Sequence, residues 1–369
     1  MDLTLENLER YLEEALGAGV RLTGVGTLGD LSGQGMKEFG YGKPLLLSYE
    51  RKGQAGAAVL SLMRGDRYGH QDSWDRARVL LFQYAAGQTM ERHARPLAVG
   101  YVDAAGQLRP IKDPAEYFLL TEKVEGHDYY LDLERIRGSR GKAGKPGKEG
   151  LFRSADLEQV REFARWLARV HAAKRDDPDR YIRRVRNLVG DCECCFGLID
   201  GYPHPYAEYP PERFMALEKR LVDWRWKLKA YTHRLCAVHG DFHPWNVLVR
   251  EGGDFSVLDR SRGEWGEPAD DLACMSINLL LFGLGERPVV EGHFLAMFLA
   301  FWQEYLDLTG DQEMLEVAAP FFVFRALVIA SPQWYPHHPS AVRQGLFRLM
   351  ENVLEDRHFN YADINSYME

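Results

Sequence analysis

The hydrophobic pattern at the start of the chain predicts a short amphipathic helix. Apolar residues recur there at helical spacing, at Leu5, Leu8, Leu12, Ala15 and Leu16. Side chains three or four residues apart share one face of a helix, and a glycine commonly ends one. Thr4 precedes the pattern and Gly17 follows it. We therefore expect a helix between these two residues, with one apolar face.

The segment from residue 22 to residue 64 changes to short β-type runs separated by glycine-rich turns. The clearest runs are residues 45–49 and 57–60. Runs of this length between turn residues are typical of strands, so the simplest arrangement is an antiparallel meander. A helix at 72–84 and two further strands at 97–102 and 117–124 complete this part of the pattern.

Most of the remaining chain shows helical spacing of its apolar residues. Helices are expected at residues 157–173, 211–231, 269–284, 291–308, 313–329 and 340–354. Two strand-like runs, 246–249 and 255–259, interrupt them and are joined by a turn, which predicts a β-hairpin. The predicted fold class is α+β, with a small antiparallel β lobe over residues 1–124 and a larger, mainly helical lobe over residues 125–369.

The composition is that of an ordinary globular protein. Of 369 residues, 46% are hydrophobic, 27% charged and 12% aromatic, which excludes a disordered chain and a disulfide-rich scaffold. The 46 Lys and Arg residues stand against 54 Asp and Glu residues, so the net charge is −8. Nucleic acid is therefore not expected as the main partner, because it binds basic surfaces.

The sequence lacks the signs of export or membrane insertion. Its first residues are rich in Glu and have no uninterrupted apolar core, unlike a secretory signal. The most apolar later stretch, residues 294–302, is shorter than the roughly 20 residues that span a bilayer. Five cysteines, an odd number, indicate reduced thiols. We expect a cytoplasmic protein without a membrane partner.

The most informative segment is residues 238–249, with the sequence VHGDFHPWNVLV. Asn246 lies five residues after Asp241, and Asp259 lies 13 residues after Asn246, at the end of the next predicted strand. Phosphoryl transfer requires an acceptor hydroxyl aimed at a γ-phosphoryl group, and magnesium to spread the developing charge. A loop Asp can orient that hydroxyl and accept its proton. Asn and Asp oxygens on either side of a hairpin suit magnesium.

This pattern of His-Gly-Asp, four residues, Asn, and a later Asp resembles the aminoglycoside phosphotransferase and choline-kinase-like branch of the protein-kinase fold. The resemblance implies that Asp241 is the catalytic carboxylate. It implies that Asn246 and Asp259 are magnesium ligands and that His239 supports the loop. In residues 260–273, which end in Asp-Leu-Ala, it implies that Asp271 ties the loop to its lobe.

The order of elements agrees with this family over roughly residues 20–330. The strand ending at residue 124, followed by Glu-Gly, resembles the hinge between the lobes. The resemblance implies that backbone groups near Glu122 and Val124 meet the adenine of ATP. It also implies that the β lobe binds the nucleotide and that a small molecule with a hydroxyl group is the second substrate.

One departure from the family pattern lies in the β lobe. A kinase-like enzyme normally offers a strand lysine to the α- and β-phosphates, but the expected strand has Ser61 at that place. Lys37, in a glycine-rich loop that would cover the phosphates, is the leading substitute. Arg64 and His70 are the alternatives.

Further features leave two interpretations open. Residues 137–150 are rich in glycine and basic residues, which predicts a flexible loop that is either a lid over an anionic ligand or a solvated insertion. Arg260 and Arg262 would approach a phosphate or an acidic substrate, or else pair with Glu264 or Glu267 at the surface.

A glycine-rich match and a cysteine cluster favour structural interpretations. Residues 24–29 match GxGxxG, but a glycine-rich turn and a strand follow instead of the helix that a dinucleotide site needs, so a dinucleotide site is not expected. These residues fit the first hairpin, and a phosphate-loop role stays open for them and for the competing glycine-rich stretch 33–42. Cys192, Cys194 and Cys195 lack the paired spacing of a zinc site, so buried thiols are expected.

Two functions from different classes follow from the sequence. The leading one is an ATP- and Mg-dependent small-molecule kinase that phosphorylates a hydroxyl group. The alternative, motivated by the missing strand lysine, is a kinase-like nucleotide-binding regulatory or scaffolding protein without phosphotransfer. Transfer of the nucleotide in place of the phosphoryl group is a minor third possibility. The sequence does not disclose the acceptor.

Overall fold

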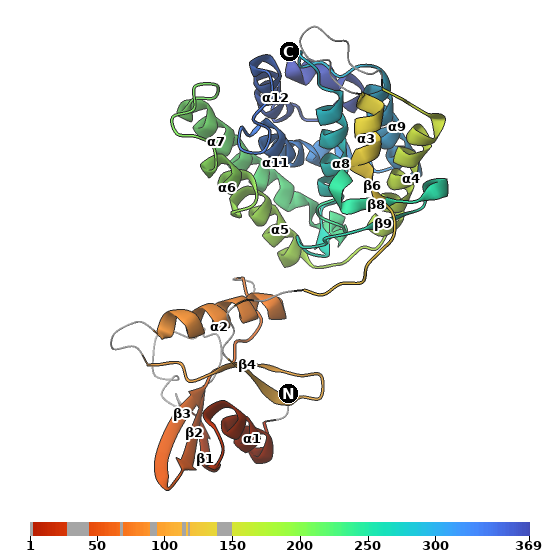
Figure 1. Ribbon diagram of the computed structural model, residues 1–369. Coiled ribbons are helices and arrows are strands. Elements are labelled where there is room, and N and C mark those ends of the chain that lie inside the picture. The colour runs from red at the N-terminus through yellow and green to blue at the C-terminus, as the bar shows by residue number, and fades with distance from the viewer. Residues whose placement is uncertain are drawn as a thin grey trace. The chain divides into compact units, whose positions relative to one another are not determined.

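The computed structural model describes residues 3–27, 44–66, 69–88, 94–112, 116, 119–138 and 150–369. These residues form two compact units, Met1–Thr121 and Glu122–Glu369 (Figure 1). Lys37, the glycine-rich loop around it and most of the basic loop lie outside the described residues, so the predictions for them stay predictions.

The first unit is built on helix α1 (Leu5–Leu16) and a three-stranded antiparallel sheet. The sheet has the order β1 (Val20–Thr27), β2 (Leu45–Arg51) and β3 (Gln54–Leu60). The Thr4 side chain accepts the N–H of Asn7 at 3.3 Å and so starts the helix. A small core joins helix and strands, formed by Leu8, Tyr11, Leu12, Val20, Leu47 and Leu108. The predicted helix and meander are both present.

The rest of this unit contains helix α2 (Ser73–Gly87) and a hairpin of β4 (Val99–Val102) and β5 (Leu108–Ile111). The sequence pattern did not predict β5. Asn7 connects it to α1, because its Oδ1 accepts the N–H of Leu108 at 3.2 Å and its Nδ2 donates to the carbonyl of Gly106 at 3.2 Å.

The strand predicted at residues 117–124 is wrong over the part that the structure describes. Residues 119–124 form no regular element, and the Leu119 and Leu120 side chains are 86% and 89% exposed. A strand needs a neighbour to pair its N–H and C=O groups. No described strand pairs with this segment, so its apolar pattern does not by itself produce a strand.

The second unit is mainly helical. Its α-helices are α3 (Tyr129–Arg137), α4 (Ser154–His171), α5 (Pro178–Gly190), α6 (Cys195–Asp200), α7 (Pro211–Leu228), α8 (Pro268–Gly283), α9 (Gly292–Thr309), α10 (Met314–Val317), α11 (Ala319–Ala330) and α12 (Ser340–Val353). Short 3-10 helices cover Lys229–Arg234, Pro244–Asn246, Glu251–Gly253 and Tyr361–Met368. The sequence pattern did not predict α3, α5 and α6.

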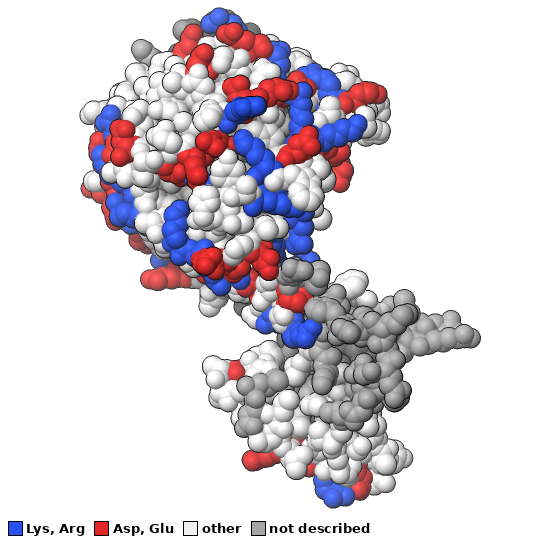
Figure 2. All heavy atoms as spheres, turned by 180° about the vertical axis from the view of Figure 1, so that it is seen from behind, with Lys and Arg blue, Asp and Glu red and all other residues white. Residues whose placement is uncertain are grey.

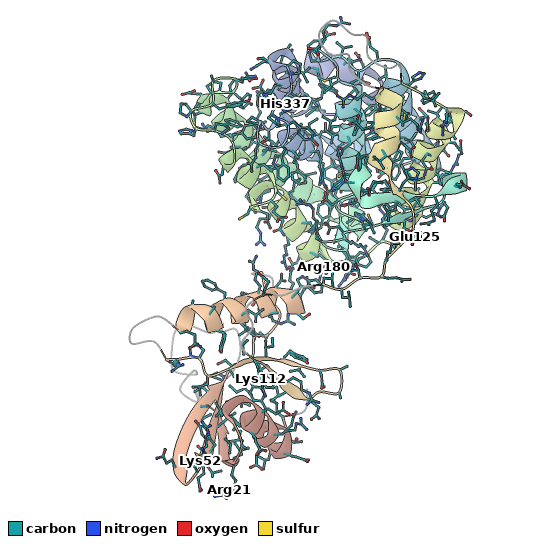
Figure 3. The ribbon with its side chains drawn as sticks, in the orientation of Figure 1. Arg21, Lys52, Lys112, Glu125, Arg180 and His337 are labelled. Carbon is teal, nitrogen blue, oxygen red and sulfur yellow. The ribbon has the colours of Figure 1, made fainter. Side chains whose placement is uncertain are left out.

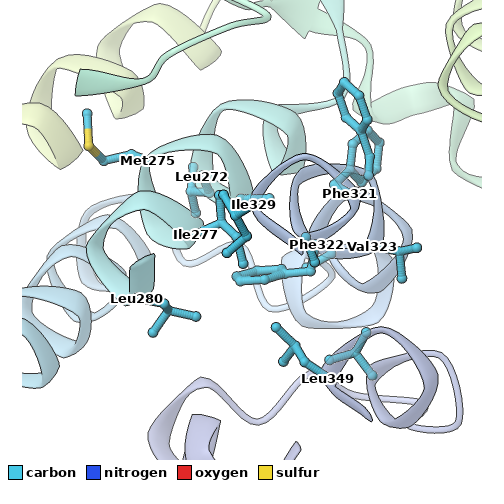
Figure 4. Close-up of a cluster of buried hydrophobic side chains, with 14 of the residues drawn as sticks. Leu272, Met275, Ile277, Leu280, Phe321, Phe322, Val323, Ile329 and Leu349 are labelled. Atoms are coloured by element: carbon cyan, nitrogen blue, oxygen red, sulfur yellow. The ribbon is translucent and has the colours of Figure 1, made fainter. Parts of the chain in front are cut away.

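Helix α8 lies at the centre of this unit. Every residue from Pro268 to Phe282 is buried. Its apolar side chains pack against α11, as Leu272, Ile277 and Phe322 show in the close-up of the core (Figure 4). A helix that is buried along its length must be covered on all sides, and α9 and α11 pack against it. The α+β fold class is confirmed.

Short strands carry the loops of the second unit. The hairpin of β8 (Val247–Val249) and β9 (Phe255–Val257) is extended by β6 (His127–Asp128), which pairs with β8. A second pair joins β7 (Cys236–Ala237) to β10 (Trp265–Gly266). The predicted hairpin is therefore present.

One face of the second unit carries charges of both signs. On the face of the second unit seen in Figure 2, basic and acidic side chains are interspersed. Among the described residues, no helix is long and apolar enough to cross a membrane.

Candidate active site

The Asp241 loop, residues 238–246, runs from β7 to β8 and is fixed by Asp271 at the start of α8. The Asp271 carboxylate accepts the N–H of His239 at 2.8 Å and the N–H of Gly240 at 2.7 Å. Gly240 has φ +86°, and a Cβ there would lie 3.3 Å from the Cβ of Arg262. Glycine adopts this backbone region freely, so the turn depends on it.

Asp271 is fully buried and receives a third hydrogen bond, from His171. His171 Nε2 lies 3.1 Å from Oδ2 of Asp271, and His171 Nδ1 lies 2.8 Å from the Tyr305 hydroxyl. Burial would raise the pKa of Asp271, but the hydrogen bonds from His171 and from the His239 backbone outweigh it and lower the pKa. Asp271 is therefore an ionised anchor that holds the loop on α8 and α4.

His239 lies inside the loop. The N–H of Asp241 donates to His239 Nδ1 at 3.3 Å, so this ring nitrogen is the acceptor. The ring packs edge-on against Phe242, with 6.0 Å between centroids. The supporting role that the resemblance implies for His239 stays a prediction.

The Asp241 carboxylate is mostly buried and lies beside two guanidinium groups and an imidazole. Oδ1 lies 2.5 Å from Nη1 of Arg325 on α11, while Oδ2 lies 3.4 Å from Nε of Arg262 and 3.7 Å from Nε2 of His243. The thiol of Cys274 on α8 donates to Oδ1 at 3.8 Å. Burial would raise the pKa of Asp241, but Arg325, Arg262 and His243 outweigh it and lower the pKa. Asp241 is thus an ionised carboxylate.

Arg325 is a residue of the site that the sequence analysis missed. Its Nη2 donates to the carbonyl of Gly240 at 2.9 Å and to Oδ1 of Asp270 at 2.6 Å. The guanidinium therefore joins the Asp241 loop to α8. The signal was a single charged residue within the apolar run FFVFRALVIA, because a lone arginine in a core helix needs buried acceptors.

Asn246 and Asp259 lie at the open end of the β8–β9 hairpin. Strand pairing matches Val247 with Val257, and the N–H of Leu258 donates to the carbonyl of Asn246 at 2.9 Å. The next residue, Asp259, is exposed and has φ +53°. Left-handed backbone is costly for residues other than glycine, and such strain gathers at functional sites.

These two side chains suit a cation that keeps other ligands. The Asn246 Nδ2 donates to the carbonyl of Asp241 at 3.1 Å, which directs its amide oxygen to the other side. Among the described residues no three His, Cys, Asp or Glu side chains meet as a metal site. Mg²⁺ commonly takes one or two protein oxygens and completes its shell with phosphate and water, so an Asn and Asp pair fits it.

The surface pairing that was one alternative for Arg260 and Arg262 is wrong. Arg260 donates to backbone carbonyls, of Val238 at 2.8 Å and of Glu264 at 3.0 Å. The carboxylate of Glu267 pairs instead with Arg234 at 2.8 Å. Arg262 lies between Asp241 and the Glu193 carboxylate, which is 3.7 Å from its Nη1.

The residues predicted to meet a nucleotide are only partly brought together. Glu122 is exposed and Val124 is partly buried. Arg250 of the β8–β9 turn donates to the carbonyl of Glu125 at 3.0 Å, so this stretch is held at the hairpin (Figure 3). In the other unit, His70 pairs with Asp66 at 3.1 Å.

The three clustered cysteines differ in burial: Cys192 is exposed, Cys194 partly buried and Cys195 buried. The expectation of buried thiols is thus wrong for Cys192. It lies in the turn before α6, outside the apolar face of that helix.

A comparison with protein families settles what kind of chain carries this loop. The model of the "Phosphotransferase enzyme family" matches residues 53–308, which include the Asp241 loop, the β8–β9 hairpin and Asp271. The chain belongs to the phosphotransferase enzyme family. The resemblance read from the sequence is therefore confirmed.

Solved structures of related phosphotransferases are similar to this chain. A glucosamine kinase in complex with glucosamine, ADP and inorganic phosphate has 18% identity and a TM-score of 0.42, covering 96% of this chain and 87% of its own. A macrolide 2′-phosphotransferase type I has 16% identity and a TM-score of 0.33, covering 88% and 90%. An ethanolamine kinase of Plasmodium vivax has 13% identity and a TM-score of 0.35, covering 94% and 80%. No curated protein sequence matches. The family assignment rests on the sequence match.

Proposed function

We propose that this phosphotransferase is an ATP- and Mg²⁺-dependent kinase that phosphorylates a hydroxyl group of a small molecule. The observation that carries the proposal is the Asp241 carboxylate, which is ionised, held by Arg325 and Arg262, and set five residues before Asn246. A family of phosphotransferases supports the reaction type.

In this mechanism Asp241 orients the acceptor. Its carboxylate accepts a hydrogen bond from the acceptor hydroxyl and takes the proton as the oxygen attacks the γ-phosphorus atom. Arg325 and Asp271 keep the loop in place, so that orientation costs little entropy at the moment of reaction. Mg²⁺, when held by Asn246 and Asp259, supplies positive charge next to the phosphate oxygens.

The proposed adenine site uses the backbone of residues 122–124. Groups near Glu122 and Val124 would hydrogen-bond the base, and Lys37 would contact the phosphates. We also propose that the enzyme works in the cytoplasm, since its five cysteines are all unpaired.

The test is ADP release in the presence of ATP and Mg²⁺ with a panel of alcohol acceptors. Asp241→Asn removes the proton acceptor but keeps the shape of the side chain, so we expect turnover to fall by about 10² to 10⁴-fold. Asp259→Asn should lose the ADP release that depends on Mg²⁺. Asp223→Asn, at an exposed position of α7, is the matched control and should keep full activity.

A contrary result has a defined meaning. If the wild type binds ATP with Mg²⁺ but consumes none with any acceptor, the chain is a regulatory or scaffolding protein of this fold. If Asp241→Asn works as well as the wild type, Asp241 is not the catalytic carboxylate. Phosphate on the product distinguishes phosphoryl transfer from transfer of the nucleotide.

A further inference from the structure

Arg184 is a cation on the inner face of α5, next to the Asp241 loop. It lies three residues after the buried Tyr181 and four before the buried Leu188, so it shares their side of the helix. A Cβ added at Gly263 would lie 3.3 Å from its Nη1, and one at Gly266 would lie 3.6 Å from its Nε. The guanidinium thus lies along the Gly263–Gly266 segment, where two glycines leave it room.

This segment places Arg184 near the reacting carboxylate. A Cβ added at Gly240, the residue before Asp241, would lie 3.5 Å from the carbonyl oxygen of Gly263. Helix α5 packs against β10, whose partner β7 leads directly into the Asp241 loop. One flank of the loop is therefore formed by α5 and its arginine.

Within the described residues Arg184 forms no ion pair and no hydrogen bond. Burial lowers the pKa of Arg184. The carboxylate of Asp270 raises this pKa, whereas the cations Arg262 and Arg183 lower it further. The Asp270 carboxylate that attracts Arg184 is already bound by Arg325 at 2.6 Å. The guanidinium has no acceptor of its own among the described residues, and guanidinium groups bind carboxylates and phosphates strongly, so the position favours a bound anion.

The ion pairs around the loop leave Arg184 without a carboxylate of its own in the described part of the chain. Arg325 pairs with Asp241 and Asp270, and Arg262 pairs with Asp241 and Glu193. Burial raises the pKa of the nearby Cys194 thiol to about 11, so this group stays neutral and does not balance the charge. The acids Asp191 and Glu193 lie at the exposed rim of the same region.

We propose that the acceptor alcohol of this kinase carries an anionic group, a carboxylate or a phosphate ester, which Arg184 binds while the hydroxyl reaches Asp241. The inference rests on the proposed kinase function and adds the substrate class. In the reaction the γ-phosphorus bond to the ADP oxygen breaks, a bond to the acceptor oxygen forms, and the hydroxyl proton passes to Asp241. A cationic amino alcohol would instead be repelled by the Arg184 guanidinium.

The test separates acceptors by charge. A bacterial metabolite extract is divided on an anion-exchange resin at neutral pH, and each fraction is incubated with the enzyme, Mg²⁺ and ATP labelled at the γ-phosphate. We expect labelled product chiefly from the retained, anionic fraction. Treating that fraction with a phosphatase beforehand distinguishes the sources: the signal is lost if the group is a phosphate ester and persists if it is a carboxylate.

Variants then assign the binding to Arg184. Arg184→Gln should raise the half-saturating amount of the anionic fraction at least 10-fold and leave the KM for ATP unchanged, whereas Arg184→Lys should recover part of the affinity. Arg186→Gln, at an exposed position on the outer side of α5, is the matched control and should behave as the wild type. Equal melting temperatures would show that all three variants fold.

Several outcomes would overturn the inference. Product from the unretained fraction would show a neutral or cationic acceptor. A raised KM for ATP in Arg184→Gln would show that Arg184 serves the nucleotide phosphates. ATP hydrolysis without a labelled product from either fraction would contradict an anionic acceptor, whereas no ATP consumption at all would refute the proposed kinase itself.

Discussion

Arg325 and Asp241 form a buried ion pair between α11 and the Asp241 loop, with 2.5 Å between Nη1 and Oδ1. The same guanidinium binds Asp270 at the start of α8. One guanidinium therefore lies between two carboxylates that would otherwise repel each other in a poorly solvated place. This arrangement links the stability of the second unit to the geometry of its reacting group.

Removing this arginine should destabilise the protein strongly. Arg325→Met leaves Asp241 and Asp270 buried without their partner, and breaking a buried pair in this way costs about 3–5 kcal/mol of unfolding free energy. Urea unfolding of wild type and variant measures the loss. Arg220→Met removes an exposed pair with Glu355 and is the control, expected to cost less than about 1 kcal/mol. Equal losses in the two variants would contradict the role of Arg325.

The contribution of Asp271 should depend on pH in a defined direction. Its pKa is lowered from the ordinary value of 3.8, so the native state favours the ionised form and this stabilisation is lost as pH falls through the lowered pKa. Asp271→Asn should cost about 1–3 kcal/mol at pH 7, because a buried N–H loses its acceptor.

The pH series checks that assignment. The gap in unfolding free energy between wild type and Asp271→Asn should be largest near neutrality and shrink below the ordinary pKa of 3.8. Urea unfolding at several pH values measures it, with the exposed Asp223→Asn as the control. A gap that stays constant down to acid pH would show that the charge of Asp271 is not what stabilises the loop.

Replacing Arg262 should shift the acid side of the pH–rate profile. Arg262 helps to lower the pKa of Asp241, so Arg262→Gln should raise that pKa. Asp241 must be ionised to accept a proton, and the fall of kcat/KM on the acid side should therefore move to higher pH. Arg260→Gln is the control, since Arg260 binds backbone carbonyls. An unmoved profile would refute the influence of Arg262 on Asp241.

At Asp259 stability and activity should separate. Its φ of +53° is unfavourable for most residues and free for glycine. Asp259→Gly should stay within about 1 kcal/mol of the wild type in unfolding free energy, and Asp259→Val should lose about 1–2 kcal/mol. Both should lose Mg²⁺-dependent ADP release. A strongly destabilised glycine variant would show that the carboxylate, and not the backbone, governs this turn.

The sequence predicted those parts of the structure that depend on local pattern. The helix after Thr4 and the β8–β9 hairpin follow from apolar spacing and turn residues, and the spacing of Asp241, Asn246 and Asp259 follows from the motif. These features use neighbours in the chain, so a linear pattern contains the information.

The features that were missed depend on contacts between distant segments. Arg325 lies 84 residues after Asp241, and only the packing of α11 on α8 brings them together. Helix α5 has Tyr181, Val185 and Leu188 at helical spacing, but its arginines obscured the stripe. The apolar run before Glu122 predicted a strand because the sequence does not show whether a pairing partner is present.

The distance in sequence between Arg325 and the Asp241 loop also orders events on the ribosome. The loop leaves the exit tunnel while α11 is still unmade, so the two carboxylates lack the Arg325 guanidinium until that helix appears. Burying them earlier would cost the solvation of both charges. The nascent protein is thus kept from closing this region until Arg325 arrives, and a chain that ends before α11 would stay open there.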